Sequence, residues 1–365
     1  MPAYRLTADS IWTSFRSSGK RHLLLTGGRG SGKTTLFSKL VPTGCPGITT
    51  WAVPQEGVYL RDNLRGETAQ IGRFDPMLPG PENRMQLCEE ALAMLGIPAL
   101  TRCAQVEGDW VSIDEIGYLE CSSPAYCSAI LQLMERKRLL AVVRKQELPF
   151  LQALCGREDV FLLDLDRPFG RLGCVIMASG LGKRFGGNKL LADFGGMPML
   201  CRSLAATDGI FSHRIVVTRH AEVERLCREM GIFVLRHDLP HRSDTVRLGL
   251  ASIADAIDGC LFSPGDQPLL RWETVASLAL SAVDDGDAIW RTAYQDAAGS
   301  PVLFPKRLFP ELLALPEGRG GGVLIQNHPE QVRTVQVRDA YELEDADTPE
   351  ALQRLQQLWE TAEKR

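Results

Sequence analysis

A chain of 365 residues is longer than one hydrophobic core usually serves, so we expect it to divide into two domains. Hydrophobic residues make up 44% of it and charged residues 24%, proportions that exclude an intrinsically disordered chain and a coiled coil. The formal net charge of −4 gives no general attraction to nucleic acid or anionic lipid, so small phosphorylated ligands are the expected partners.

Secretory and membrane segments are not expected. The first twenty residues lack the apolar core and the small-residue cleavage site of a signal peptide, and no later stretch is apolar enough to cross a bilayer. We therefore expect a cytoplasmic protein without a membrane partner.

The ten cysteines include no CxxC pair, which argues against a zinc ribbon or a redox dithiol and predicts reduced core thiols. The close pair Cys121 and Cys127 is assigned no function.

In the first half, short apolar runs alternate with amphipathic segments, the pattern of a parallel sheet covered by helices. The expected strands are residues 22–26, 111–113, 139–143 and 160–163. The expected helices are residues 33–40, 85–95, 128–136 and 148–154. Residues 47–75 are rich in Thr, Val and Tyr with Gly turns, which predicts a β-meander or flap near the ligand.

The strand at residues 22–26 leads into GGRGSGKT, residues 27–34, which matches the P-loop pattern GxxxxGK[ST] in full. In such a loop the backbone N–H groups enclose the phosphates, Lys33 reaches the terminal phosphates, and the Thr34 hydroxyl ligates Mg²⁺. The predicted nucleotide-binding residues are Gly27, Gly28, Arg29, Gly30, Ser31, Gly32, Lys33, Thr34 and Thr35.

A carboxylate pair follows the expected strand 111–113. Asp114 is expected at the carboxyl end of that strand, where α/β proteins bind ligands, and is predicted to hold Mg²⁺. Glu115 is suited to orient or deprotonate an attacking water, a role that separates a hydrolase from a kinase. Capping of a following turn is the alternative for both carboxylates. Arg144 is a candidate transition-state cation, with a solvated arginine at a strand end as the alternative.

The elements GGRGSGKTTL and SIDEIGYLE resemble those of the small P-loop nucleoside triphosphatases first associated with thermophiles. The resemblance covers about the first 165 residues. It implies slow, Mg²⁺-dependent hydrolysis of several nucleoside triphosphates, with ATP or GTP as the expected substrate. Because the end of this half is short and lacks an evident basic base-stacking segment, the base preference stays open.

A domain boundary is expected in DLDRPFGRL, residues 164–172, which mixes Pro, Gly and charge. We place a P-loop nucleoside-triphosphatase domain at residues 1–168 and a second α/β domain at residues 169–365. The expected strands beyond the boundary are residues 174–177, 214–217, 232–235, 259–262, 288–292, 302–304 and 332–337. Helices are expected at residues 221–230 and 245–254.

A second glycine-rich loop, ASGLGKRFGGNK at residues 178–189, lacks the GK[ST] ending and carries two cations instead. Arg184 is expected to grip the β and γ phosphates, and Lys189 to neutralise charge at the α phosphate as the bond to pyrophosphate breaks. A surface turn is the alternative for such a loop. The predicted nucleotide-binding residues here are Ala178, Ser179, Gly180, Arg184 and Lys189.

Two aspartates follow in loops. Asp266, in PGDQP, comes just after the expected strand 259–262, and Asp347, in DADTPE, precedes a helix expected to begin near residue 349. Two carboxylates together with phosphate oxygens suit Mg²⁺, which would bridge the triphosphate. A turn or N-cap role is the alternative for each aspartate.

With SDTVRLGL at residues 243–250 and GSPVLF at residues 299–304, these elements resemble the molybdenum cofactor nucleotidyltransferases, especially the cytidylyltransferase branch. The resemblance implies a Rossmann-like nucleotidyltransferase fold and transfer of CMP from CTP to molybdopterin, with release of pyrophosphate. Residues 178–180 are Ala-Ser-Gly where the family more usually has Ala-Ala-Gly or Ala-Gly-Gly, and PGDQP differs from the commoner GDMP; both departures touch base selection. The expected acceptor residues are Ser243, Asp244, Arg247, Gly299 and Ser300, with helix capping the alternative for Asp244 and a simple turn for the last two.

These features together predict a bifunctional protein that matures a molybdenum hydroxylase of the xanthine dehydrogenase type. An N-terminal nucleoside triphosphatase would be fused to a C-terminal molybdopterin cytidylyltransferase, with catalytic roles for Glu115, Arg184 and Lys189. One alternative is a nucleotidyltransferase that uses another phosphorylated acceptor. The other is a non-catalytic maturation chaperone whose nucleotide sites act as binding switches.

Overall fold

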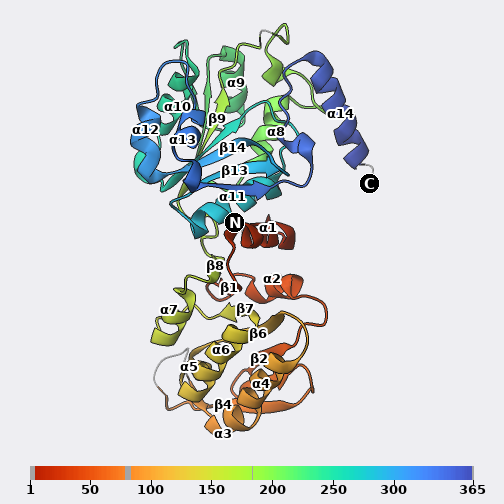
Figure 1. The fold of residues 1–365 in the computed structure, drawn as a ribbon, viewed down its shortest axis with the longest axis vertical. Coiled ribbons are helices and arrows are strands. Elements are labelled where there is room, and N and C mark those ends of the chain that lie inside the picture. The colour runs from red at the N-terminus through yellow and green to blue at the C-terminus, as the bar shows by residue number, and fades with distance from the viewer. Residues whose placement is uncertain (1–4, 79–83, 183, 364–365) are drawn as a thin grey trace. The chain divides into compact units, whose positions relative to one another are not determined.

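The computed structural model describes residues 5–78, 84–182 and 184–363. Contacts divide this described chain into two compact units (Figure 1). The N-terminal unit is Gly19–Pro168, and the C-terminal unit combines Phe169–Arg365 with the chain up to Ser18. Helix α1 (Ala8–Ser18) therefore packs in the C-terminal unit, whereas we expected it in the first domain.

The sheet of the N-terminal unit has the strand order β5-β4-β3-β2-β6-β7-β1-β8. Strands β2, β6, β7, β1 and β8 run parallel, and β3, β4 and β5 continue from β2 as an antiparallel meander. The strands are β1 (His22–Thr26), β2 (Gly47–Val53), β3 (Gly57–Asp62), β4 (Thr68–Phe74), β5 (Met85–Leu87), β6 (Trp110–Ile116), β7 (Arg138–Val143) and β8 (Val160–Asp164). The expected meander is present and widens the central sheet.

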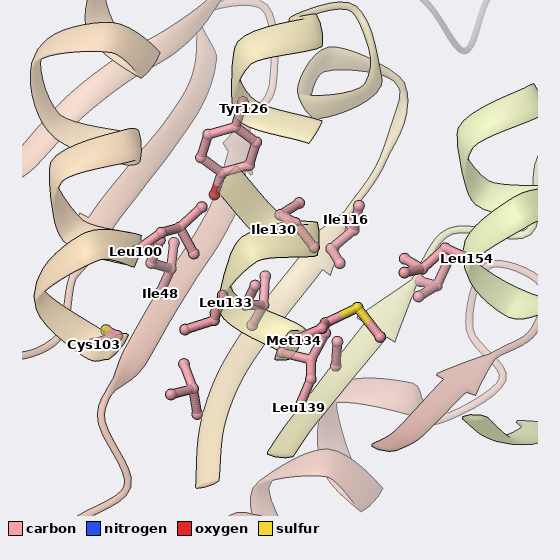
Figure 2. Packing of buried hydrophobic residues seen from close by; sticks show 14 of the residues in the cluster. Ile48, Leu100, Cys103, Ile116, Tyr126, Ile130, Leu133, Met134, Leu139 and Leu154 are labelled. Carbon is pink, nitrogen blue, oxygen red and sulfur yellow. The ribbon is translucent and has the colours of Figure 1, made fainter. Parts of the chain in front are cut away.

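Helices of the N-terminal unit cover the sheet with apolar stripes. In α6 (Pro124–Arg136), the buried residues Tyr126, Ile130 and Leu133 recur at helical spacing and pack with Leu100 and other core side chains (Figure 2). Ser123 starts this helix, because its hydroxyl accepts a 3.4 Å hydrogen bond from Tyr126 N. The other helices are α2 (Lys33–Leu40), α3 (Glu89–Ala91), α4 (Ile97–Gln105), α5 (Tyr118–Cys121) and α7 (Pro149–Cys155).

The helix expected at residues 85–95 begins later than predicted. Met85–Leu87 forms the edge strand β5, whose residues pair with Gly72 to Phe74 of β4. The apolar-polar-apolar order of these three residues fits a strand, and the open edge of β4 supplies the partner backbone groups. Helical structure follows as α3, a π-helical segment Leu92–Gly96 and α4.

The sheet of the C-terminal unit has the order β11-β10-β9-β12-β14-β13-β15. Strands β11, β10, β9 and β12 run parallel, β14 is antiparallel to both of its neighbours, and β15 is parallel to β13. The strands are β9 (Leu172–Ala178), β10 (His213–Thr218), β11 (Val234–Arg236), β12 (Gly259–Pro264), β13 (Ile289–Tyr294), β14 (Ala297–Pro305) and β15 (Val332–Gln336). The predicted α/β class is thus confirmed in both units.

Helices lie on both faces of this sheet, with α10, α12 and α13 on one side and α8 and α11 on the other (Figure 1). Gly249 lets α10 approach closely, because a β-carbon there would meet Val175 of β9 at 2.5 Å. The helices are α8 (Met199–Ala206), α9 (Ala221–Glu229), α10 (Arg242–Ala251), α11 (Trp272–Asp284), α12 (Phe309–Leu313), α13 (Gly322–Asn327) and α14 (Pro349–Glu363).

Helix α1 docks on α11 through a buried seam. The side chains of Ile11 and Phe15 are 0% and 2% exposed. Ser14 Oγ donates a 2.9 Å hydrogen bond to Ser277 O, and Ser277 Oγ donates in return to Ser10 O at 3.1 Å. This reciprocal pair fixes how α1 lies along α11.

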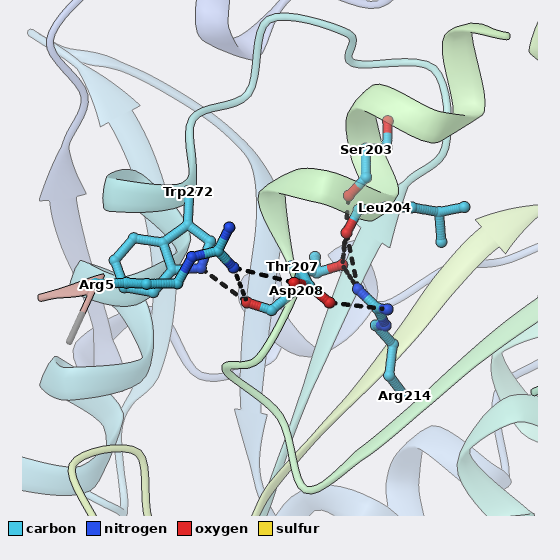
Figure 3. Close-up of polar contacts among 7 residues, drawn as sticks. All are labelled: Arg5, Ser203, Leu204, Thr207, Asp208, Arg214 and Trp272. Carbon is cyan, nitrogen blue, oxygen red and sulfur yellow. Dashed lines mark hydrogen bonds and ion pairs between the residues drawn. The ribbon is translucent and has the colours of Figure 1, made fainter. Parts of the chain in front are cut away.

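The segment before α1 is held in the same unit by the polar contacts drawn in Figure 3. The Arg5 guanidinium lies 5.6 Å from the ring centre of Trp272 and donates a 3.0 Å hydrogen bond to the carboxylate of Asp208. Trp272 Nε1 donates to Asp208 O at 2.8 Å, and Arg214 donates to Leu204 O at 2.8 Å. The first described residue is therefore part of the C-terminal unit.

Two expectations from the composition can be compared with the described residues. Each cysteine lies within the described ranges and is a free thiol. No helix in those ranges has the length and apolarity that a membrane span requires.

Candidate functional sites

The first glycine loop joins β1 to α2 at residues 27–34. Gly30 and Gly32 have φ angles of 79° and 89°, a left-handed region that favours glycine. Lys33 Nζ turns back over the loop and donates 2.8 Å hydrogen bonds to the carbonyls of Gly27 and Gly28. The ammonium thus lies above the loop that is predicted to enclose phosphates.

The remaining residues predicted for this loop differ in exposure. Arg29, Gly30, Thr34 and Thr35 are exposed, whereas Ser31 Oγ is buried and has no hydrogen-bond partner within the described chain. An exposed Thr34 hydroxyl at the start of α2 is available to a metal ion.

Asp114 and Glu115 lie in the carboxyl-terminal part of β6, at the end of the sheet where ligands were expected. Burial, and then the neighbouring Glu115, raise the pKa of Asp114 to about 6, although Lys33 opposes this shift. Lys33 is therefore near enough to Asp114 for their charges to interact. One carboxylate and one threonine hydroxyl, completed by phosphate oxygens and water, are a donor set that suits Mg²⁺.

Glu115 is held by two neighbours. Its Oε1 accepts a 2.6 Å hydrogen bond from Arg144 Nε, and its backbone N–H donates to Thr50 Oγ1 at 2.9 Å. The Arg144 guanidinium also lies 5.9 Å from the ring centre of Tyr118. Arg144 therefore contacts the candidate base, and its side chain is 41% exposed.

Motif analysis missed a carboxylate that braces the first glycine loop. Asp166 accepts hydrogen bonds from Gly28 N at 3.0 and 2.9 Å, one to each carboxylate oxygen. Lys145 Nζ lies 2.7 Å from Asp164 Oδ2 and 2.9 Å from Asp166 Oδ2. The hydrogen bond from Lys145, with that from Gly28, lowers the pKa of Asp166. The available signal was its position just beyond the carboxyl end of β8.

The second glycine loop brings together four charged residues that the sequence had singled out. Lys189 Nζ forms an ion pair with Asp266 and lies 2.7 Å from Asp347 Oδ1. Arg184 forms an ion pair with the other oxygen of Asp347. The Lys189 side chain is 9% exposed and that of Arg184 is 71% exposed. Two cations and two carboxylates thus meet at one place, with Lys189 at its base.

The charges in this cluster stabilise one another. Although burial alone would lower the pKa of Lys189, Asp266 and Asp347 raise it above its usual value. The hydrogen bond from Lys189 lowers the pKa of Asp347, and Arg184 adds to that shift. At neutral pH the cluster therefore carries a protonated lysine and an ionised Asp347.

Backbone contacts explain why these residues meet. Gly182 has a φ of 58°, and a β-carbon there would meet Gly187 O at 2.3 Å, so glycine is required for the loop to fold on itself. Ala346 N donates a 2.9 Å hydrogen bond to Asp266 O, which ties DADTPE to PGDQP. Thr348 supplies the N-cap contact of α14 by accepting from Ala351 N at 3.2 Å. Asp347 is thus free of the capping role and faces the cations.

No group of three or more His, Cys, Asp or Glu side chains suited to a metal occurs within the described ranges. Mg²⁺ does not need one, since it is commonly held by one or two carboxylates with substrate phosphates. Asp266 and Asp347, which both contact one ammonium, fit that role if a triphosphate supplies the remaining oxygens.

The residues predicted for the acceptor have mainly structural contacts. Ser243 is 0% exposed, so its hydroxyl offers no surface to an acceptor. Asp244 accepts a 2.8 Å hydrogen bond from His241 N and pairs with Arg247, which closes the first turn of α10 as in the capping alternative. Gly299 O accepts 3.3 and 3.2 Å hydrogen bonds from Arg291. Ser300 is half-buried in β14.

Comparisons with known proteins assign the two halves separately. Residues 22–168 match the family model described as NTPase, and residues 174–332 match that of the MobA-like NTP transferase domain. The nucleoside-triphosphatase THEP1 of Thermofilum pendens is 30% identical over 155 residues, which are 39% of this chain and 85% of that protein.

Two further proteins resemble parts of the chain. The bifunctional protein GlmU of Micrococcus luteus is 30% identical over 152 residues, which are 37% of this chain and 31% of that protein. A solved nucleotidyl transferase of Methanothermobacter is 23% identical, with a TM-score of 0.47, and the match covers 53% of this chain and 99% of that one.

Proposed function

We propose that this chain transfers CMP from CTP to molybdopterin. The chain belongs to the nucleoside-triphosphatase THEP1 family in residues 22–168 and carries a MobA-like NTP transferase domain in residues 174–332. Its N-terminal unit is a nucleoside-triphosphatase domain, for which we propose ATP or GTP as substrate. The identities of the acceptor and of both bases rest on the motif resemblance described above.

The observation that carries the transferase proposal is the convergence of Lys189, Arg184, Asp266 and Asp347. In the reaction, an oxygen of the molybdopterin phosphate attacks the α phosphorus of CTP, and the bond from that phosphorus to the bridging oxygen of pyrophosphate breaks. Lys189 neutralises the charge that develops at the α phosphate, and Arg184 holds the departing phosphates. Asp266 and Asp347 would hold Mg²⁺, which would supply further positive charge there.

Hydrolysis in the N-terminal unit follows a different route. Glu115 takes part by orienting or deprotonating the attacking water, and Arg144, which already contacts Glu115, supplies positive charge near the transferring phosphoryl group. Lys33 holds the terminal phosphates, and Asp114 with Thr34 would hold Mg²⁺. The unit releases phosphate, whereas the transferase releases pyrophosphate.

The wider role that we propose is maturation of a molybdenum hydroxylase of the xanthine dehydrogenase type, in which hydrolysis drives delivery or insertion of the cofactor. The fusion of the two domains motivates this role. Complementation of cells with K33A tests the coupling, because unchanged activation of the client enzyme would exclude it.

The transferase proposal is tested by pyrophosphate release from each of the four nucleoside triphosphates, with and without molybdopterin, and by mass measurement of the product. We expect release with CTP plus molybdopterin, and its loss in D266A. Equal release with unrelated phosphorylated acceptors would favour a different nucleotidyltransferase. Absence of transfer together with phosphate release no greater than in E115Q would favour a nucleotide-switched chaperone, whereas phosphate release abolished by E115Q would exclude it.

A further inference from the structure

The start of the second glycine loop is attached to a buried histidine that motif analysis did not single out. His237, just after β11, places Nε2 3.0 Å from the hydroxyl of Ser179 and 3.3 Å from that of Thr245. Ser179 and His237 are 9% and 8% exposed, and Thr245 is 1% exposed. The Ser179 side chain therefore points into the fold, although the next residue of the loop, Gly180, is exposed.

The hydrogen-bond directions fix the protonation of His237. Leu239 N donates to His237 Nδ1 at 3.2 Å, so Nδ1 is the acceptor and Nε2 carries the proton. Ser179 Oγ donates to Val217 O at 3.1 Å and therefore accepts from Nε2–H. The contacts form a one-way chain from Leu239 through His237 and Ser179 to Val217, and this chain needs neutral imidazole.

Strand β10 and the turn after it hold the same part of the loop from another direction. Thr218 Oγ1 donates a 2.9 Å hydrogen bond to Ala178 O. His220 Nε2 lies 2.8 Å from Gly180 O and must donate, because a carbonyl oxygen only accepts. Gly180 is exposed, and a β-carbon on it would meet nothing within 4 Å. The loop therefore presents a fixed, open stretch of backbone at Gly180.

We propose that His237 is a positioning residue of the nucleotide site, which acts through the Ser179 hydroxyl to fix the backbone at residues 178–180 against the nucleoside half of the triphosphate. Arg184 and Lys189 engage the phosphates, so the earlier part of the loop is left for the base and ribose. This inference rests on the proposed transferase function and extends it. It also explains the serine at position 179, because its hydroxyl accepts a hydrogen bond from His237 and does not contact the ligand.

The surroundings of His237 favour the neutral form that the contacts require. Burial, and then the guanidinium of Arg219, lower the pKa of His237, while Asp244 and Asp238 oppose the shift. Protonation at Nδ1 would remove the acceptor for Leu239 N–H and place a positive charge close to Arg219.

Steady-state kinetics of pyrophosphate release with CTP test the proposal. We expect H237A to raise the KM for CTP roughly fivefold to tenfold with kcat little changed, the effect of losing one or two buried hydrogen bonds. H237Q retains a donor near the Nε2 position and should recover most of the loss. S179A should raise KM similarly, and S179A/H237A should be no worse than either single variant. H213A, at an exposed histidine of the same strand β10, is the matched control.

A second measurement does not depend on catalysis and observes the wild-type site directly. Ring-nitrogen NMR of the intact protein, labelled at its six histidines and assigned with H237Q, should show the neutral His237 ring protonated at Nε2, with a pKa below the usual value of a histidine. A ring protonated at Nδ1, or one that titrates near pH 6.5, would overturn the proposal, as would an unchanged KM in H237A.

A different result would show failure of the transferase assignment than would show failure of the role of His237. Absence of pyrophosphate from the wild-type protein with every acceptor would refute that assignment alone. Calorimetry would still measure the affinity for CTP, in the presence of Mg²⁺, of H237A, H237Q and H213A. Each would be combined with K33A, which disables the first loop. Equal CTP affinity in all three would overturn the role of His237.

Discussion

Glu115 Oε1 and Arg144 Nε are 2.6 Å apart, which places the candidate base of the N-terminal unit in direct contact with a cation from the neighbouring strand end. The pair explains how a carboxylate one residue from Asp114 is oriented before substrate binds. It also means that loss of the arginine removes both a charge and the support of Glu115.

Substitution of this pair should impair hydrolysis and spare transfer. E115Q should lower phosphate release on the order of a hundredfold, the range expected for loss of a general base. R144A should lower it at least tenfold, because the phosphoryl group loses a nearby positive charge. Phosphate release by R138A, at an exposed arginine that begins strand β7, which ends just before Arg144, is the control. Equal rates in R144A and R138A would remove Arg144 from the mechanism.

The N-terminal unit should lose stability in acid partly through His22. Burial, more than any charge, lowers the pKa of His22 from 6.5 to about 4, and its Nδ1 accepts a 3.0 Å hydrogen bond from Leu139 N. Since the unfolded chain binds the proton more tightly, this stability is present above pH 6.5 and is lost as pH falls through about 4. The full effect is about 3 kcal/mol.

Thermal unfolding from pH 7 to pH 4 measures this effect. H22N keeps an acceptor for Leu139 but does not titrate, so its melting temperature should fall less steeply over that range. H213N, at an exposed histidine, should follow the wild type. Parallel curves for wild type and H22N would show that His22 does not contribute.

Helix α1 should stabilise the C-terminal unit. I11A or F15A removes a fully or almost fully buried side chain from the seam with α11, which should cost about 2 to 5 kcal/mol. The unfolding transition of the C-terminal unit, identified by its shift with CTP, should move to lower temperature. T13A, at a half-buried position of the same helix, is the control. If I11A or F15A instead lowered only the unfolding temperature that ATP or GTP changes, which is that of the N-terminal unit, helix α1 would not belong to the C-terminal unit.

Substitution of either aspartate that contacts Lys189 should lower pyrophosphate release, whereas substitution of an exposed aspartate elsewhere in the unit should not. D266N and D347N should each lower pyrophosphate release at least a hundredfold at limiting Mg²⁺, with partial recovery at high Mg²⁺ because one carboxylate remains. D258N, which breaks an exposed ion pair with Arg171, should act like wild type. Loss of transfer in D347N without any dependence on Mg²⁺ would show that Asp347 acts by holding Arg184 and Lys189 and not as a metal ligand.

Sequence patterns located both glycine-rich loops and the charged residues at strand ends because each is a local signal: glycines at fixed spacing, or a carboxylate directly after an apolar run. The contact between Lys189 and Asp347, 158 positions apart, was not predicted, because no local pattern pairs residues that lie so far apart along the chain. The edge strand β5 was missed because three residues are too short to override a helical pattern without knowledge of the open edge of β4.

Other features depend on which surfaces meet in three dimensions. The apolar stripe of α1 predicts a buried face but not the unit that covers it. Asp166 and His237 lie in loops without a motif, and each acts by a contact with a glycine loop far along the chain. Ser179 was predicted to bind nucleotide, yet the burial of its hydroxyl became visible only with its partner in place.

The most direct test of two separate nucleotide sites is to measure phosphate and pyrophosphate release in K33A and K189A alongside the wild type. With nucleoside triphosphates and molybdopterin present, K33A should lose phosphate release and keep pyrophosphate release, and K189A should show the reverse. If K189A retained pyrophosphate release, or if K33A abolished it, the assignment of transfer to the cluster of Lys189, Asp266 and Asp347 would be contradicted.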